Sequence, residues 1–232
     1  LAISVYDTMR SKKAITLEQH QAIYETIPRY VMIKAMPGTI GCTEEGCAAL
    51  SKFTNVFVDE SLWSTLGPFG AIGCASSNFY INPRYFLAMF EALRSQDWPR
   101  LAPMCDKLEK MSRETAHGLL PDTYHDTAYD RLKGNLAGFL RTSLSNRGPY
   151  PSTSRHDVEK VREWCRREFP EILELCKSSI SASISISDSG FPMSNSFLIL
   201  KCCGIMLINS LTYARRGAFM SRMDYLWVLL LF

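Results

Sequence analysis

The sequence predicts an α/β protein that is built first from alternating strands and helices and then from helices alone. Short apolar, β-branched runs alternate with amphipathic helical patterns over residues 1–81, as they do in a parallel sheet. Only helical patterns follow over residues 82–175. The 232 residues are 47% hydrophobic and 21% charged, which is typical of a globular protein with a sizeable core.

The first strand is predicted at residues 1–6, where the letters read LAISVY. Residues 16–27 then form a helix, because Thr16 and Gln19 make a capping box. The apolar stripe expected to face the core consists of Leu17, Ala22, Ile23 and Ile27. Residues 30–35 (YVMIKA) form a second, buried strand.

The same alternation continues through two further strands. A helix is predicted at residues 43–53, with Thr43 as its cap, before a strand at 55–59 (NVFVD). A short helix at 60–66 leads to a fourth strand at 70–76 (GAIGCAS). The small residues of this strand indicate the close approach of another backbone or a ligand.

The second part of the chain is predicted to be helical throughout. Its helices are expected at residues 83–94, 98–114, 127–144 and 155–169. Ser154 caps the last of them, and its many charges favour a solvated surface over a binding site.

Lys34 stands at the carboxyl end of the second predicted strand, where α/β proteins place their chemistry. In dry surroundings the pKa of a lysine falls, and its amine can attack a carbonyl carbon. The alternative is a strand-end lysine that simply reaches solvent. Lys34 follows Tyr6 by 28 positions, close to the ~31 residues per unit of a ~250-residue eight-stranded barrel.

Composition excludes several other classes of function. A net charge of +3 does not indicate a nucleic-acid partner or an anionic membrane. The four histidines have no zinc spacing, so we expect no metal and no cofactor. The eight cysteines form no CxxC motif and indicate reduced thiols of a cytoplasmic protein. Cys74 could act as a nucleophile, but a small buried thiol is the favoured interpretation.

Four stretches of the chain carry a family resemblance. They are Tyr6-Asp7-Thr8-Met9-Arg10-Ser11-Lys12-Lys13, Met32-Ile33-Lys34-Ala35-Met36-Pro37-Gly38, the lead-in Leu66-Gly67-Pro68-Phe69-Gly70, and Gly70-Ala71-Ile72-Gly73-Cys74-Ala75-Ser76-Ser77-Asn78 before Pro83. Their order and spacing resemble the Tyr-Asn-x-Pro-x-x-Thr-Gly, Gly-Ile-Lys-Glu and Gly-Val-Ile-Ser-Val-x-x-Asn motifs of the dihydrodipicolinate synthase / N-acetylneuraminate lyase family. These are Schiff-base class I aldolases on a (β/α)8 barrel with added C-terminal helices.

The resemblance covers residues 1 to about 173 and implies a partial TIM (β/α)8 barrel, strands five to eight, followed by C-terminal helices. It implies that Lys34 forms a Schiff base with pyruvate or another 2-oxo acid, and that Tyr6 relays protons. Ile72 and Gly73 would line the floor under this substrate, and Arg10 would meet a distal carboxylate. Intact family members are homo-oligomers, so the resemblance implies association with further copies of the same chain.

The chain departs from the family's motifs at several positions. Asp7 replaces Asn, Met9 replaces Pro, and Ala35 stands where the family has Glu. These changes favour a divergent branch, such as one that acts on sugar acids. Strands one to four of the barrel, with the loop that holds the substrate carboxylate, would precede Leu1. The alternative function is therefore a truncated, inactive family member or a half-barrel assembly partner.

Residues 176–232 differ in character from the rest. Ile and Ser nearly alternate after Cys176, and apolar runs follow at 197–213 and 225–232. We expect no membrane span, because one needs ~20 apolar residues and the first run contains Lys201. Aggregation-prone strands are a second interpretation. We favour a third, in which this tail arises from a missed splice or frame change and is not natively folded.

Overall fold

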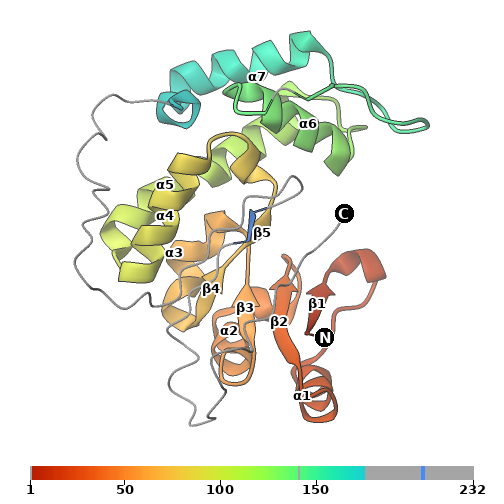
Figure 1. Ribbon diagram of the computed structural model, residues 1–232, viewed down its shortest axis with the longest axis vertical. Coiled ribbons are helices and arrows are strands. Elements are labelled where there is room, and N and C mark those ends of the chain that lie inside the picture. The colour runs from red at the N-terminus through yellow and green to blue at the C-terminus, as the bar shows by residue number, and fades with distance from the viewer. Residues whose placement is uncertain (1, 141, 176–204, 207–232) are drawn as a thin grey trace, which may run out of the picture. The chain divides into compact units, whose positions relative to one another are not determined.

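The computed structural model describes residues 2–140, 142–175 and 205–206 (Figure 1). They form two compact units. The first contains residues 2–76, 90–106 and 205–206, and the second contains the remaining described residues. Apart from 205–206, the predictions for the tail after Cys176 lie outside the described residues.

The first unit is built on a parallel sheet whose strands follow one another in chain order, β1-β2-β3-β4. The strands are β1 (Ile3–Asp7), β2 (Tyr30–Ala35), β3 (Asn55–Phe57) and β4 (Ala71–Gly73). The predicted α/β class with a parallel sheet is therefore confirmed. In the register of this sheet Tyr6 pairs with Lys34, and Lys34 pairs with Phe57.

Helices connect these strands as the sequence predicts. They are α1 (Leu17–Thr26), α2 (Glu44–Leu50) and α3 (Trp63–Leu66), with 3-10 turns at Met9–Ser11, Ile40–Cys42, Glu60–Leu62 and Gly67–Phe69. The capping box is present, because the Gln19 backbone N–H donates to Thr16 Oγ1 and the Thr16 N–H donates to Gln19 Oε1. Thr43 caps α2 by accepting the Gly46 N–H at 3.0 Å.

The predicted buried face of α1 is wrong at one position. Ala22 is exposed, and the residue of α1 that is fully buried is His20. His20 can lie inside because polar side chains of the sheet satisfy both of its ring nitrogens.

Two predicted strands are shorter than expected. β3 ends at Phe57 because Asp59 instead caps the next turn, where its Oδ1 accepts the Ser61 N–H at 3.0 Å. The fourth strand is interrupted at Cys74, and β5 (Ala75–Ser76) pairs antiparallel with β6 (Ile205–Met206).

The two faces of the sheet are packed differently. On the face that bears Lys34, Met32, Phe57 and Ile72 form a buried apolar cluster. On the opposite face the backbone of Gly41 lies so close to β2 that an added Cβ would stand 2.6 Å from Ala35 Cβ. A glycine is therefore required at position 41.

The helical part begins with α4 (Pro83–Ser95) and α5 (Trp98–Glu114), which agree with the predicted ranges. A 3-10 turn (Asn78–Tyr80), a π-helical turn (Thr115–Leu119), α6 (Asp126–Leu136), α7 (Arg155–Glu168) and a last 3-10 turn (Pro170–Leu173) complete it. The predicted extension of α6 to residue 144 is wrong. The chain leaves the helix after Leu136 and reaches Gly138, whose φ of +77° is unfavourable for other residues.

One side of α7 is buried, and the solvated face predicted from its many charges lies on the rest of the helix. Val158, Val161 and Trp164 are buried, and Trp164 Nε1–H donates to Glu114 on α5 at 2.8 Å. Most of its charged residues are exposed, and Glu168, one turn after Trp164 on the same side, pairs with Lys110 of α5 at 2.8 Å. No helix among the described residues is long and apolar enough to cross a bilayer.

Candidate functional site

Lys34 and Tyr6 lie together at the carboxyl ends of neighbouring strands. They are register partners, and the Lys34 Nζ lies 4.5 Å from the centroid of the Tyr6 ring. Lys34 is half-buried, and Tyr6 is 39% exposed. A cation over an aromatic face is attracted by the ring quadrupole, so the pair holds the amine beside a phenol at an accessible surface.

The loops that follow these two strands also contact each other. The Met36 N–H donates to the carbonyl of Asp7 at 3.1 Å. Gly38 adopts a φ of +88°, and a Cβ there would stand 3.0 Å from Met9 Cγ. Glycine thus allows the loop after β2 to close over the loop after β1.

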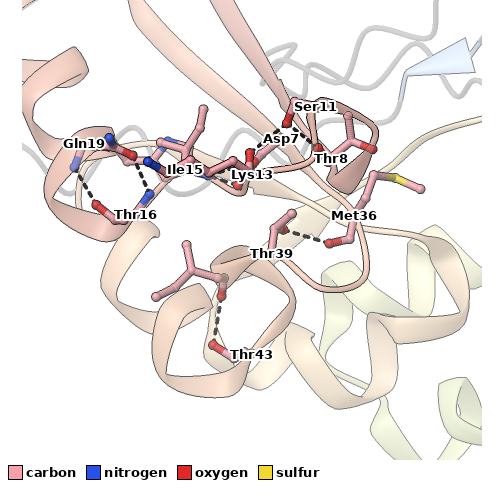
Figure 2. A network of polar contacts seen from close by, with 12 residues as sticks. Asp7, Thr8, Ser11, Lys13, Ile15, Thr16, Gln19, Met36, Thr39 and Thr43 are labelled. Atoms are coloured by element: carbon pink, nitrogen blue, oxygen red, sulfur yellow. Dashed lines mark hydrogen bonds and ion pairs between the residues drawn. The ribbon is translucent and has the colours of Figure 1, made fainter.

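Side-chain hydrogen bonds hold each of these loops in shape (Figure 2). The Ser11 hydroxyl donates to the carbonyls of Thr8 and Lys13 at 2.8 and 2.7 Å. The Thr39 hydroxyl donates to the Met36 carbonyl at 2.8 Å. Short local bonds of this kind fix turns that have no ladder partners.

Ile72 and Gly73 lie on β4, two strands away from Lys34. The Ile72 side chain packs in the apolar cluster with Met32 and Phe57, the register partner of Lys34. The carbonyl of Gly73 accepts the Val58 N–H at 3.0 Å. Arg10 lies in the exposed 3-10 turn after β1, where its backbone N–H donates to Thr8 Oγ1 at 3.4 Å.

Cys74 is completely buried directly after β4. Burial raises the pKa of its thiol well above the usual value, and the nearby carboxylates Glu60 and Asp59 raise it further. The charge of Lys34 acts in the opposite direction but does not offset these effects. A thiol that stays protonated is a poor nucleophile, so the structure favours the buried-thiol interpretation.

Three polar side chains that the sequence analysis did not single out as a group are buried behind the site. His20, Asp7 and Tyr30 are 0%, 2% and 3% exposed. His20 Nδ1 lies 2.9 Å from Tyr30 Oη, and His20 Nε2 lies 3.4 Å from Asp7 Oδ2. The available sequence signal was the position of His20, three residues from both Leu17 and Ile23 on the apolar stripe of the helix.

Burial lowers the pKa of His20, although the hydrogen bond and the charge of Asp7 partly oppose this effect. In the unfolded chain His20 has a pKa near 6.5 and therefore binds a proton at a higher pH than it does in the folded protein. This contribution to stability is fully present above pH 6.5 and is lost progressively as the pH falls from there through the lower pKa of His20 in the folded protein.

We expect His20→Gln to reduce the loss of stability between about pH 7.5 and 5.5, because glutamine does not titrate. Urea unfolding at the two pH values measures the difference. Equal losses in wild type and variant would show that His20 does not take up the proton.

Within the part of the chain that the structure describes, no group of three or more His, Cys, Asp or Glu side chains could hold a metal ion.

No protein-family model matches the chain, and no curated protein sequence is significantly similar to it. Solved structures do match. Dihydrodipicolinate synthase from Aquifex aeolicus superimposes with a TM-score of 0.59 at 16% identity, over 72% of this chain and 55% of that one. Dihydrodipicolinate synthase from Thermotoga maritima gives 0.57 at 17% identity, over 72% and 56%.

A third structure matches to a similar extent. YagE from E. coli K12, a prophage protein of the dihydrodipicolinic acid synthase family crystallised in complex with pyruvate, gives a TM-score of 0.61 at 13% identity, over 76% and 57%. The chain spans little more than half the length of these structures. The chain is therefore similar in fold to structures of the dihydrodipicolinate synthase family over about 72% of its length.

Proposed function

We propose that this chain is a lyase of the dihydrodipicolinate synthase type, in which Lys34 forms a Schiff base with pyruvate or another 2-oxo acid. In this proposal residues 1–81 are the second half of a (β/α)8 barrel and residues 82–175 are its C-terminal helical region. Residues 176–232 are a tail that, apart from the pairing of Ile205–Met206 with β5, lies outside the native fold. The position of Lys34 Nζ above the Tyr6 ring, at the carboxyl ends of parallel strands, carries the proposal.

The chemistry begins with addition of the unprotonated Lys34 amine to the keto carbon of the substrate. The carbonyl oxygen takes one proton from the attacking amine and one from the Tyr6 phenol, and it leaves as water as the protonated C=N bond forms. The protonated imine then accepts the electron pair released at the neighbouring carbon when a carbon–carbon bond breaks, or stabilises the carbanion before one forms. Ile72 and Gly73 form the floor, and Arg10 receives a distal carboxylate.

Reductive trapping tests the proposal on the full chain. The protein is incubated with pyruvate and borohydride, and its intact mass and modified peptide are measured. We expect the mass to increase by that of pyruvic acid less one oxygen atom, with the modification on Lys34. Absence of this adduct, in protein with native near-UV circular dichroism, would contradict the proposal.

Tyr6→Phe is expected to slow trapping by about 10²-fold or more, because it keeps the ring under Lys34 but removes the proton donor. The trapping rate constant at saturating pyruvate measures this change. The half-saturating pyruvate concentration should change little. A rate equal to that of wild type would mean that another group or water transfers the proton.

A half-barrel assembly partner is the second candidate, supported by the order of the sheet. Among the described residues, β1 and β4 each pair with a strand on one side only, and unpaired strand edges favour association. Gel filtration with light scattering tests this candidate. A monomer with native near-UV circular dichroism would count against it.

A further inference from the structure

We propose that Asp7 and His20 are positioning residues that hold Tyr6 beneath Lys34, through a hydrogen-bonded chain on the opposite face of the sheet. This role rests on the proposed function, since it concerns the same site. This hydrogen-bonded chain consists of the three buried side chains Asp7, His20 and Tyr30.

Adjacent residues of a strand point to opposite faces. Tyr6 is 39% exposed on one face, whereas the next residue, Asp7, is 2% exposed on the other. A restraint on the Asp7 side chain therefore acts on the backbone from which the Tyr6 ring projects.

Asp7 is attached to several segments at once. Its Oδ1 accepts the Ile15 N–H at 3.2 Å from the loop before α1, and its Oδ2 lies 3.4 Å from His20 Nε2. Its backbone carbonyl accepts the Met36 N–H, two residues beyond Lys34. The end of β1 is thus fixed to the loop, to the helix and to the strand that carries the lysine.

The other end of the hydrogen-bonded chain fixes the start of β2, the strand that carries Lys34. Tyr30 is the first residue of β2. The pairing of β1 with β2 shifts register directly after it, which interrupts the alternation, and its hydroxyl bonds His20 at 2.9 Å on the face of Asp7. With His20 neutral, Nε2–H donates to the Asp7 carboxylate and Nδ1 accepts the Tyr30 hydroxyl proton, so that each group is satisfied. β2 is therefore held at its start by Tyr30 and just beyond its end by Met36.

Burying three polar side chains is costly unless each is hydrogen-bonded. Apolar residues of similar volume would fill this space without that requirement. What the polar chain adds is one defined geometry, because hydrogen bonds are directional where apolar contacts are not.

The test observes the Lys34–Tyr6 contact without requiring catalysis. Lysine amines are methylated with ¹³C-formaldehyde under reducing conditions, and the Lys34 resonance is assigned by its loss in Lys34→Arg. In wild type we expect an upfield shift from the Tyr6 ring current, which Tyr6→Leu removes. Asp7→Ala should lose more than half of this shift. Asp7→Asn should retain it, because asparagine can still accept the Ile15 N–H, and its amide can donate to Nε2 of the other His20 tautomer, whose Nδ1–H then donates to the Tyr30 hydroxyl oxygen.

Asp157→Ala is the matched control. Asp157 is another buried carboxylate, 7% exposed, and it accepts hydrogen bonds from Tyr124 at 2.8 Å and from Ser154. Its loss should destabilise the protein and leave the Lys34 shift unchanged.

If Asp7→Ala does not fold, Tyr30→Phe tests the positioning role instead, because it removes a single hydroxyl. We expect a smaller decrease of the shift in the same direction.

Trapping provides the functional measurement. At saturating pyruvate the rate constant of Asp7→Ala should fall by about 10²-fold with its half-saturating concentration nearly unchanged, and Asp7→Asn should restore it. A purely structural role would lower the amount of adduct but not its rate constant. Wild type that traps no pyruvate would refute the proposed function, and the resonance shifts would still decide the positioning role. Wild-type shifts in folded Asp7→Ala and in Tyr30→Phe would overturn it.

Discussion

Lys34→Ala is expected to lower pyruvate trapping to the background level, a loss of at least about 10³-fold, because no other group replaces an amine that becomes covalently bonded. The rate of adduct formation, measured by intact mass under borohydride, tests this expectation. The substitution removes a half-buried side chain and the cation above Tyr6, so near-UV circular dichroism must accompany the measurement.

Two further variants separate the nucleophile from the charge. Lys34→Arg keeps a cation over the Tyr6 ring but cannot form the imine, so we expect it to be as inactive as alanine. Lys52→Ala removes an exposed lysine of the same unit and should trap at the wild-type rate. Adduct formation in Lys34→Ala at the wild-type rate would assign the chemistry to another lysine.

Trp63→Ala is expected to destabilise the protein by about 3–5 kcal/mol, which is the usual cost of truncating a large buried aromatic residue. Trp63 is fully buried in α3, and its ring lies 6.1 Å from that of Phe90. Its Nε1–H donates to the carbonyl of Gly73 at 3.1 Å, so the substitution also leaves an acceptor at the end of β4 with one bond fewer. Urea unfolding measures the change.

Trp63→Phe divides this effect into its parts. The smaller phenyl ring fills part of the same space, and the lost hydrogen bond should cost about 0.5–1.5 kcal/mol, because the Gly73 carbonyl still accepts the Val58 N–H. Tyr150→Ala is the surface control. Its side chain is 55% exposed, so the change in the free energy of unfolding should be within about 0.5 kcal/mol. A similar loss for Trp63→Ala and Tyr150→Ala would show that α3 is not part of the cooperative core.

Local sequence signals predicted the helix starts and the alternation of strands and helices along the chain. Thr16 with Gln19, and Ser154 with Asp157, cap their helices through bonds to residues three positions away. Such bonds depend only on neighbouring residues, so they can be predicted without knowledge of the fold. The run YVMIKA likewise needed only its apolar, β-branched content to be assigned to β2.

Features that depend on distant parts of the chain were missed. Burial of His20 requires Asp7 from β1 and Tyr30 from β2, and helical periodicity alone assigned the inner face to other residues. The end of β3 was misplaced because Asp59 had been counted as a strand residue, whereas its carboxylate caps the following turn. Competition between side-chain and backbone partners decides such boundaries.

The sequence placed Tyr6 and Lys34 on two strands, and the structure brings them together as register partners. Spacing alone could not show how close the amine and the ring would be, since that depends on the twist of the sheet and on the loops between Asp7 and Met36.

The chain order of the sheet has a consequence for how the protein folds. Each strand of the parallel sheet after β1 pairs with the strand before it. The register pairs Tyr6–Lys34, Lys34–Phe57 and Phe57–Gly73 therefore each close one short loop. The entropy lost on loop closure rises with loop length, so the pairing of β3 with β4 costs least. The sheet can therefore grow from that pair by adding one strand at a time, with no long-range encounter in its nucleus.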